Sequence, residues 1–126
     1  GSEMCIRDRW AIGGGDWSFG WGDQDDQDAI AGIKMGVDLG VNWIDTAAIY
    51  GDGASELLVG KALRDMPGSE RPLVATKCGR IMQQDASVKG RLKKESVIGE
   101  CEASLQRLGM ECIDLYQIHW PDPDGI

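Results

Sequence analysis

Four side chains that can take part in proton transfer end or follow short apolar runs in the sequence. They are Asp45, Tyr50, Lys77 and His119. A buried carboxylate without a partner is costly, so Asp45 needs a nearby cation or has a chemical role, and Lys77 is the candidate cation. An ammonium beside a phenol stabilises the phenolate and lowers its pKa from about 10, which suits Tyr50 to act as an acid near neutral pH. His119 can hydrogen-bond a substrate carbonyl, so these residues indicate a proton donor with groups that polarise an oxygen.

The same sequence offers no obvious covalent nucleophile and no standard set of metal ligands. Its cysteines, Cys5, Cys78, Cys101 and Cys112, form no C-x-x-C pair, and His119 is the only histidine. Zinc sites and thioredoxin-type motifs need closer ligand spacing than this. We therefore predict reduced, structural thiols and no metal site, and metal-assisted hydrolysis is a weak hypothesis.

Strands that alternate with amphipathic helices must position these side chains. The predicted strands are Trp10–Gly15, Val41–Ile44, Pro72–Lys77 and Cys112–Trp120. Apolar residues at helical spacing predict helices over Asp25–Leu39, from about Ala54 to just before Pro67, and through Ile98–Leu108. The polar segment Cys78–Lys94 is predicted to be a long loop.

This alternation predicts an α/β fold of parallel βαβ units whose sheet is covered by helices. Either a doubly wound sheet or a (β/α)₈ barrel fits the pattern, and in both folds the chemistry lies at the carboxyl ends of the strands. The second, third and fourth predicted strands end near Asp45, Lys77 and His119, so we expect these three side chains on one rim.

Length and charge exclude several classes of partner. The 126 residues suit one domain, and 21 acidic against 13 basic residues give a formal net charge of -8, which disfavours nucleic acid and anionic membranes. There is no apolar run of about 20 residues and no secretory signal, so we expect a cytoplasmic protein. Residues 1–9 begin with Gly-Ser, typical of a cloning scar, and are expected to be non-native or disordered, which leaves residues 10–126 as the domain.

Three stretches give the sequence a family resemblance: DTAAIYGDGASELLVGKAL, VATKCG and SLQRLGMECIDLYQIHWPDP. In this order they resemble the first half of an aldo-keto reductase, from about Trp10 to Pro123. The resemblance implies a (β/α)₈ barrel, NADP(H) as cofactor, and reduction of an aldehyde or ketone. The catalytic tetrad of that family falls on the following residues: Asp45, Tyr50, Lys77 and His119.

The resemblance also implies a role for each of these residues. Tyr50 protonates the carbonyl oxygen, Lys77 and Asp45 tune Tyr50, and His119 orients the carbonyl, while Asp45 is also expected to contact the cofactor. Trp17 and Trp120 are expected to line the substrate pocket, although Trp17 packing simply as an apolar side chain is an equal alternative.

A complete barrel takes roughly 250 residues, and four predicted strands make about half of one. Such a half-barrel has open edges at its first and fourth strands, so we expect self-association. Two copies closing a barrel, a partly disordered chain and a sheet folded on itself are alternatives that the sequence does not rank. Two hypotheses for function follow: an NADPH-dependent carbonyl reductase acting on a small substrate, and a non-catalytic binding module that associates with itself.

Overall fold

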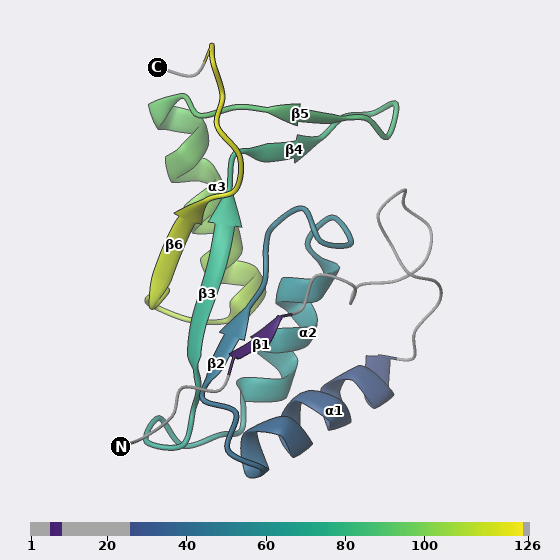
Figure 1. Cartoon of the computed structure of the whole chain (residues 1–126), viewed down its shortest axis with the longest axis vertical. Coiled ribbons are helices and arrows are strands. Elements are labelled where there is room, and N and C mark those ends of the chain that lie inside the picture. The colour runs from purple at the N-terminus through teal and green to yellow at the C-terminus, as the bar shows by residue number, and fades with distance from the viewer. Residues whose placement is uncertain (1–5, 9–25, 125–126) are drawn as a thin grey trace.

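The computed structural model describes residues 6–8 and 26–124 and contains a parallel sheet with helices packed against it (Figure 1). The sheet has the order β1-β2-β3-β6, formed by β1 (Ile6–Asp8), β2 (Trp43–Asp45), β3 (Leu73–Cys78) and β6 (Leu115–Ile118). The helices are α1 (Asp26–Asp38), α2 (Ala54–Leu63) and α3 (Lys94–Leu108). All three pairings in this sheet are parallel, as the alternation of strands and helices predicts.

The first strand differs from its predicted position. β1 is Ile6–Asp8, which pairs with β2 in the register Ile6↔Trp43 to Asp8↔Asp45. β1 therefore falls within residues 1–9, before the start of the predicted domain at residue 10, while the expectation that this segment is non-native or disordered stays a prediction. An edge strand is held by backbone bonds to a single neighbour, so it does not need the continuous apolar run used to search for it. The predicted strand Trp10–Gly15 lies outside the described residues.

The predicted long loop Cys78–Lys94 contains a second, two-stranded antiparallel sheet, which corrects that expectation. β4 (Arg80–Met82) and β5 (Val88–Gly90) form a hairpin beyond the carboxyl end of β3 (Figure 1). In the turn of this hairpin, the Asp85 carboxylate accepts hydrogen bonds from the backbone N–H and the hydroxyl of Ser87, which stabilise the turn. Each strand has only three residues of mixed polarity, which is too short for a clear alternating pattern.

The hydrophobic core lies between the sheet and the helices. Its buried side chains come from all three helices and the two central strands: Ile33, Ile44, Val59, Ala62, Leu63, Val74 and Leu108. Gly60 allows α2 to approach the end of α3 closely, since a Cβ atom there would lie 2.6 Å from the Arg107 carbonyl oxygen. Ile98, which the helical pattern placed on the apolar face of α3, is 49% exposed. No helix within residues 26–124 is long and apolar enough to cross a membrane.

Candidate active site at the carboxyl ends of the strands

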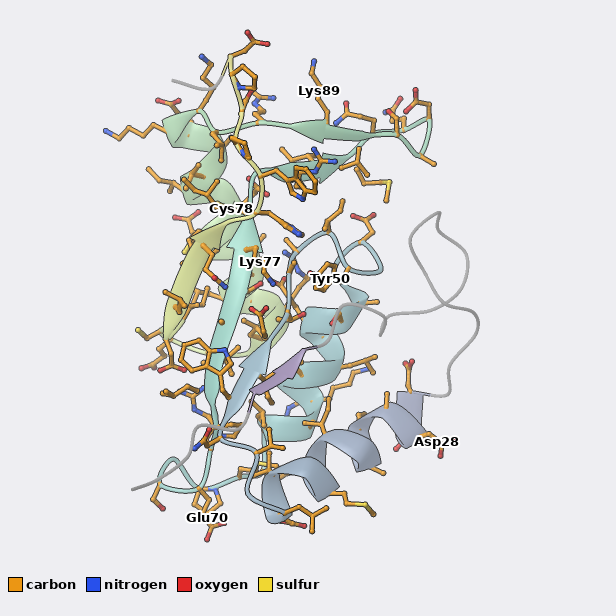
Figure 2. All side chains as sticks on the ribbon, in the orientation of Figure 1. Asp28, Tyr50, Glu70, Lys77, Cys78 and Lys89 are labelled. Atoms are coloured by element: carbon orange, nitrogen blue, oxygen red, sulfur yellow. The ribbon has the colours of Figure 1, made fainter. Side chains whose placement is uncertain are left out.

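The sheet brings the four candidate residues to one end. Asp45 is the last residue of β2, Lys77 is the penultimate residue of β3, and His119 directly follows β6. The backbone N–H of His119 donates to the Cys78 carbonyl, which extends the pairing of β6 with β3 by one bond. Tyr50 lies in the turn between β2 and α2, and Figure 2 shows its side chain beside Lys77 at this end of the sheet.

The predicted ion pair between Asp45 and Lys77 is present. The Lys77 Nζ atom lies 2.9 Å from Asp45 Oδ2 and also donates to the Thr46 carbonyl oxygen at 2.9 Å. The two charged side chains are only 14% and 22% exposed, so their attraction is screened less than that of a surface pair. Two acceptors therefore hold the ammonium at a fixed place above the strand ends.

Tyr50 is buried against this ammonium and against the imidazole. Its ring centroid lies 5.2 Å from Lys77 Nζ and 5.6 Å from the His119 ring, which it meets edge to face at 85°. The turn that carries Tyr50 is fixed by backbone bonds, since Tyr50 N–H donates to the Ala47 carbonyl and its own carbonyl accepts from Ser55 N–H. The Tyr50 ring thus lies next to an ammonium and an imidazole, two groups of the kind that take part in proton transfer.

Gln117 belongs to the same cluster, and our sequence reasoning missed it. Its side-chain amide nitrogen donates to Asp45 Oδ1 at 3.2 Å, across the width of β3. The signal available in the sequence was a polar residue within the apolar run of the fourth strand. In the sheet, Gln117 is paired with Lys77, which brings the Gln117 side chain within reach of Asp45. This register cannot be read from one sequence.

Of the two tryptophans predicted to line the substrate pocket, the structure describes only Trp120. Trp120 is next to His119 and is 58% exposed, with the Arg80 guanidinium 5.4 Å from the centre of its ring. Trp17 lies outside the described residues. A cavity of about 500 Å³ lies elsewhere, between the end of α2 and the segment after α3, and none of the four candidate residues lines it.

A buried polar cluster lies on the helix-facing side of β3, opposite the face that carries Lys77. The Glu56 carboxylate is fully buried, accepts a 2.6 Å bond from Arg107 Nε and accepts a second bond from the Thr76 hydroxyl.

Two further ionisable groups lie on β3 and β6. Burial raises the pKa of the Tyr116 phenol above its ordinary value and also raises the pKa of the Cys78 thiol. Both groups are therefore neutral at physiological pH, so neither supplies a reactive anion to the rim.

Metal ligation has little support in the described part of the chain. There, no group of three or more His, Cys, Asp or Glu side chains is arranged to hold a metal ion. Cys78, Cys101 and Cys112 are free thiols, and Cys5 lies outside the described residues. The described rim brings together a carboxylate, an ammonium, a phenol and an imidazole, which are groups of the kind that exchange protons or polarise a bound oxygen.

Comparison with known proteins gives one consistent likeness. The sequence model of the aldo/keto reductase family matches residues 11–125. The chain is 38% identical to the aldo-keto reductase YhdN of Bacillus subtilis over 89% of its own length and 34% of that protein. It is 42% identical to an NADH-specific methylglyoxal reductase of Escherichia coli over 88% of its own length and 36% of that protein. It therefore spans about a third of these curated relatives.

Solved structures show the same likeness. A glycerol dehydrogenase from Gluconobacter oxydans aligns with a TM-score of 0.80 and 39% identity, covering 94% of this chain and 36% of that one. An aldo-keto reductase from Klebsiella pneumoniae in complex with NADPH aligns with a TM-score of 0.65 and 30% identity, covering 89% and 36% respectively. These likenesses confirm the expected fold class, the parallel β/α units of a TIM barrel, of which the chain comprises about half.

Proposed function

This chain belongs to the aldo/keto reductase family, and we propose that its strand-end rim is the proton-donating part of an NADPH-dependent carbonyl reductase. The observation that supports this function is the assembly of Asp45, Lys77, Tyr50 and His119 from three strand ends and one turn. In the proposed reaction an aldehyde or ketone becomes an alcohol, with a proton added to its oxygen by Tyr50.

We assign each of the four residues a role that its surroundings support. The Lys77 ammonium, 5.2 Å from the ring centre, stabilises the phenolate that Tyr50 becomes after it gives up its proton. Asp45 holds that ammonium in place through the 2.9 Å ion pair. His119 lies at the ring edge of Tyr50, where it can hydrogen-bond the same substrate oxygen and orient it.

A nicotinamide cofactor supplies the hydride for this reduction when it is bound. Asp45 fits the role of holding it, because each carboxylate oxygen accepts one bond from the residues that the structure describes and the side chain remains 22% exposed, which leaves lone pairs for a hydroxyl group. We propose NADPH, as in the Klebsiella pneumoniae complex, although the Escherichia coli relative is named NADH-specific.

The substrate in this proposal is a small carbonyl compound. Trp120 is adjacent to His119 and exposes more than half of its surface, so it can form an apolar wall beside the reacting carbonyl. Trp17 is proposed as a second wall. The assay follows oxidation of NADPH by the purified chain with methylglyoxal, which the name of one relative suggests, and then with longer aldehydes. Consumption that requires both aldehyde and protein supports the function, and no consumption at any protein concentration contradicts it.

A second candidate function is a non-catalytic module that associates with itself, and exposed apolar side chains at the sheet favour it. Within the described residues, β1 and β6 each have a neighbouring strand on one side only. Ile118 of β6 is 65% exposed and Leu115 of the same strand is 40% exposed. We propose that copies of the chain pair through this edge, because an open apolar edge strand is a template for association.

Replacing Ile118 with lysine is expected to convert the associated chain to a monomer, since a charge on the β6 edge would have to be buried in the contact. The measurement is mass by light scattering on a size-exclusion column at several concentrations. Leu39→Lys is the matched control, because Leu39 is 81% exposed and follows α1. A wild-type mass equal to one chain at all concentrations would contradict the association.

A further inference from the structure

We propose that Gln117 is a positioning residue of this site, whose side-chain amide fixes the Asp45 carboxylate and thereby sets how strongly Lys77 acts on Tyr50. This inference rests on the proposed function. Its basis is the 3.2 Å bond from Gln117 Nε2 to Asp45 Oδ1 together with the 2.9 Å contact of Asp45 Oδ2 with Lys77 Nζ.

The two oxygens of Asp45 have donors that come from different strands. Oδ1 faces the amide from β6 and Oδ2 faces the ammonium from β3, so rotation of the carboxylate about its own axis would disturb both bonds. Without the amide, both oxygens are free to turn toward the Lys77 ammonium. The carboxylate would then neutralise more of the ammonium charge, because a second oxygen approaches it.

Sheet register explains why a glutamine can reach Asp45 from the far side of β3. Asp45 is paired with Ala75, and Lys77 is paired with Gln117 one step further along the same face of the sheet. Ala75 is fully buried and has only a methyl side chain, which leaves the space between β2 and β6 open to the long glutamine side chain. An asparagine is one methylene shorter, so we expect it to lose the 3.2 Å contact with Asp45.

The consequence for Tyr50 is electrostatic. Among the described contacts, the titratable groups that face Tyr50 are the Lys77 ammonium and the His119 imidazole, and Asp45 acts on it through Lys77. A hydrogen bond to Asp45 Oδ1 withdraws part of the carboxylate charge. The Lys77 ammonium is then neutralised less by Asp45 and stabilises the Tyr50 phenolate more strongly. Removing the Gln117 amide should therefore make Tyr50 harder to ionise.

The test is an alkaline titration of the full chain followed by tyrosinate absorbance. The sequence has two tyrosines, and burial raises the pKa of Tyr116, so the first transition belongs to Tyr50. We expect Gln117→Leu to raise the midpoint of that transition by about half a pH unit, a threefold change in the ionisation constant. Gln117→Met, which also lacks the donor but is unbranched like glutamine, provides a second variant if the leucine does not fold.

Two controls separate positioning from a general structural effect. Gln106→Leu makes the same chemical change on the exposed face of α3 and should leave the midpoint unchanged. In an Asp45→Asn background, Gln117→Leu should produce no further shift, because the carboxylate through which Gln117 acts is gone. An unchanged midpoint in both Gln117 variants, or an equal shift with and without Asp45, would overturn the proposal.

The outcome for Gln117 can be separated from the outcome for the proposed function, since the titration needs no cofactor or substrate. A shift that depends on Asp45, in a chain that reduces no carbonyl, would support the positioning role and reject the enzyme. Carbonyl reduction by a chain that shows no such shift would support the enzyme and reject the positioning role of Gln117.

Discussion

Tyr50→Phe is expected to lower the rate of carbonyl reduction by at least about a hundredfold, the usual contribution of a positioned general acid. The substitution removes only the hydroxyl, so the ring keeps its place in the buried cluster with Ala47 and Ile49 and its edge contact with His119. Binding of NADPH should be nearly unchanged, because in this proposal the phenol acts on the substrate oxygen. The comparison is of NADPH oxidation rates at saturating aldehyde.

The other tyrosine of the chain provides the matched control for this experiment. Tyr116 lies on β6, next to Gln117, but its phenol is buried near Cys78 and takes no part in the proposed proton transfer. Tyr116→Phe should therefore keep the wild-type rate. If Tyr50→Phe also kept the full rate, Tyr50 could not be the proton donor, whatever the other three residues do.

The second large effect concerns stability. Glu56→Ala is expected to lower the free energy of unfolding by about 3–5 kcal/mol, the usual cost of breaking a buried ion pair by removing one partner. Glu56 is fully buried, and its loss leaves the Arg107 guanidinium, which is 26% exposed, and the buried Thr76 hydroxyl without their shared acceptor. It also opens a gap where α2, α3 and β3 meet.

Urea unfolding followed by far-ultraviolet circular dichroism measures this change. Glu102→Ala is the control, since Glu102 lies on the exposed face of α3 and should shift the free energy of unfolding by less than about 0.5 kcal/mol. Equal stabilities of the two variants would mean that the Glu56 cluster does not hold the helices to the sheet.

The sequence predicted the rim well because its signals there are local. A short apolar run that ends in a charged residue marks both the strand and its end, so the sequence alone is enough to assign Asp45 and Lys77 to neighbouring strand ends and to pair them. Tyr50 lies in a turn that has no hydrophobic pattern to identify it. It was proposed because a phenol beside an ammonium can give up a proton, and the family resemblance then pointed to the same residue.

The parts that the sequence did not predict depend on contacts between distant residues. The local pattern around Glu56 indicates only the entry of a helix, whereas its ion-pair partner Arg107 lies 51 positions away. Gln117 becomes recognisable only when the register of β3 and β6 is known. β1 and the β4–β5 hairpin were missed because three-residue strands of mixed polarity are defined by their backbone partners and not by a periodic pattern.

The central claim is that Asp45, Lys77, Tyr50 and His119 act as one proton-donating unit, and the ionisation of Tyr50 tests it most directly. The measurement compares the pH midpoint of the first tyrosinate transition in the wild-type chain and in Lys77→Met, which keeps a long side chain but lacks the ammonium 5.2 Å from the ring centre. The claim predicts a midpoint that rises by about one pH unit or more when the ammonium is removed. An unchanged midpoint would show that Lys77 does not act on Tyr50 and would contradict the account.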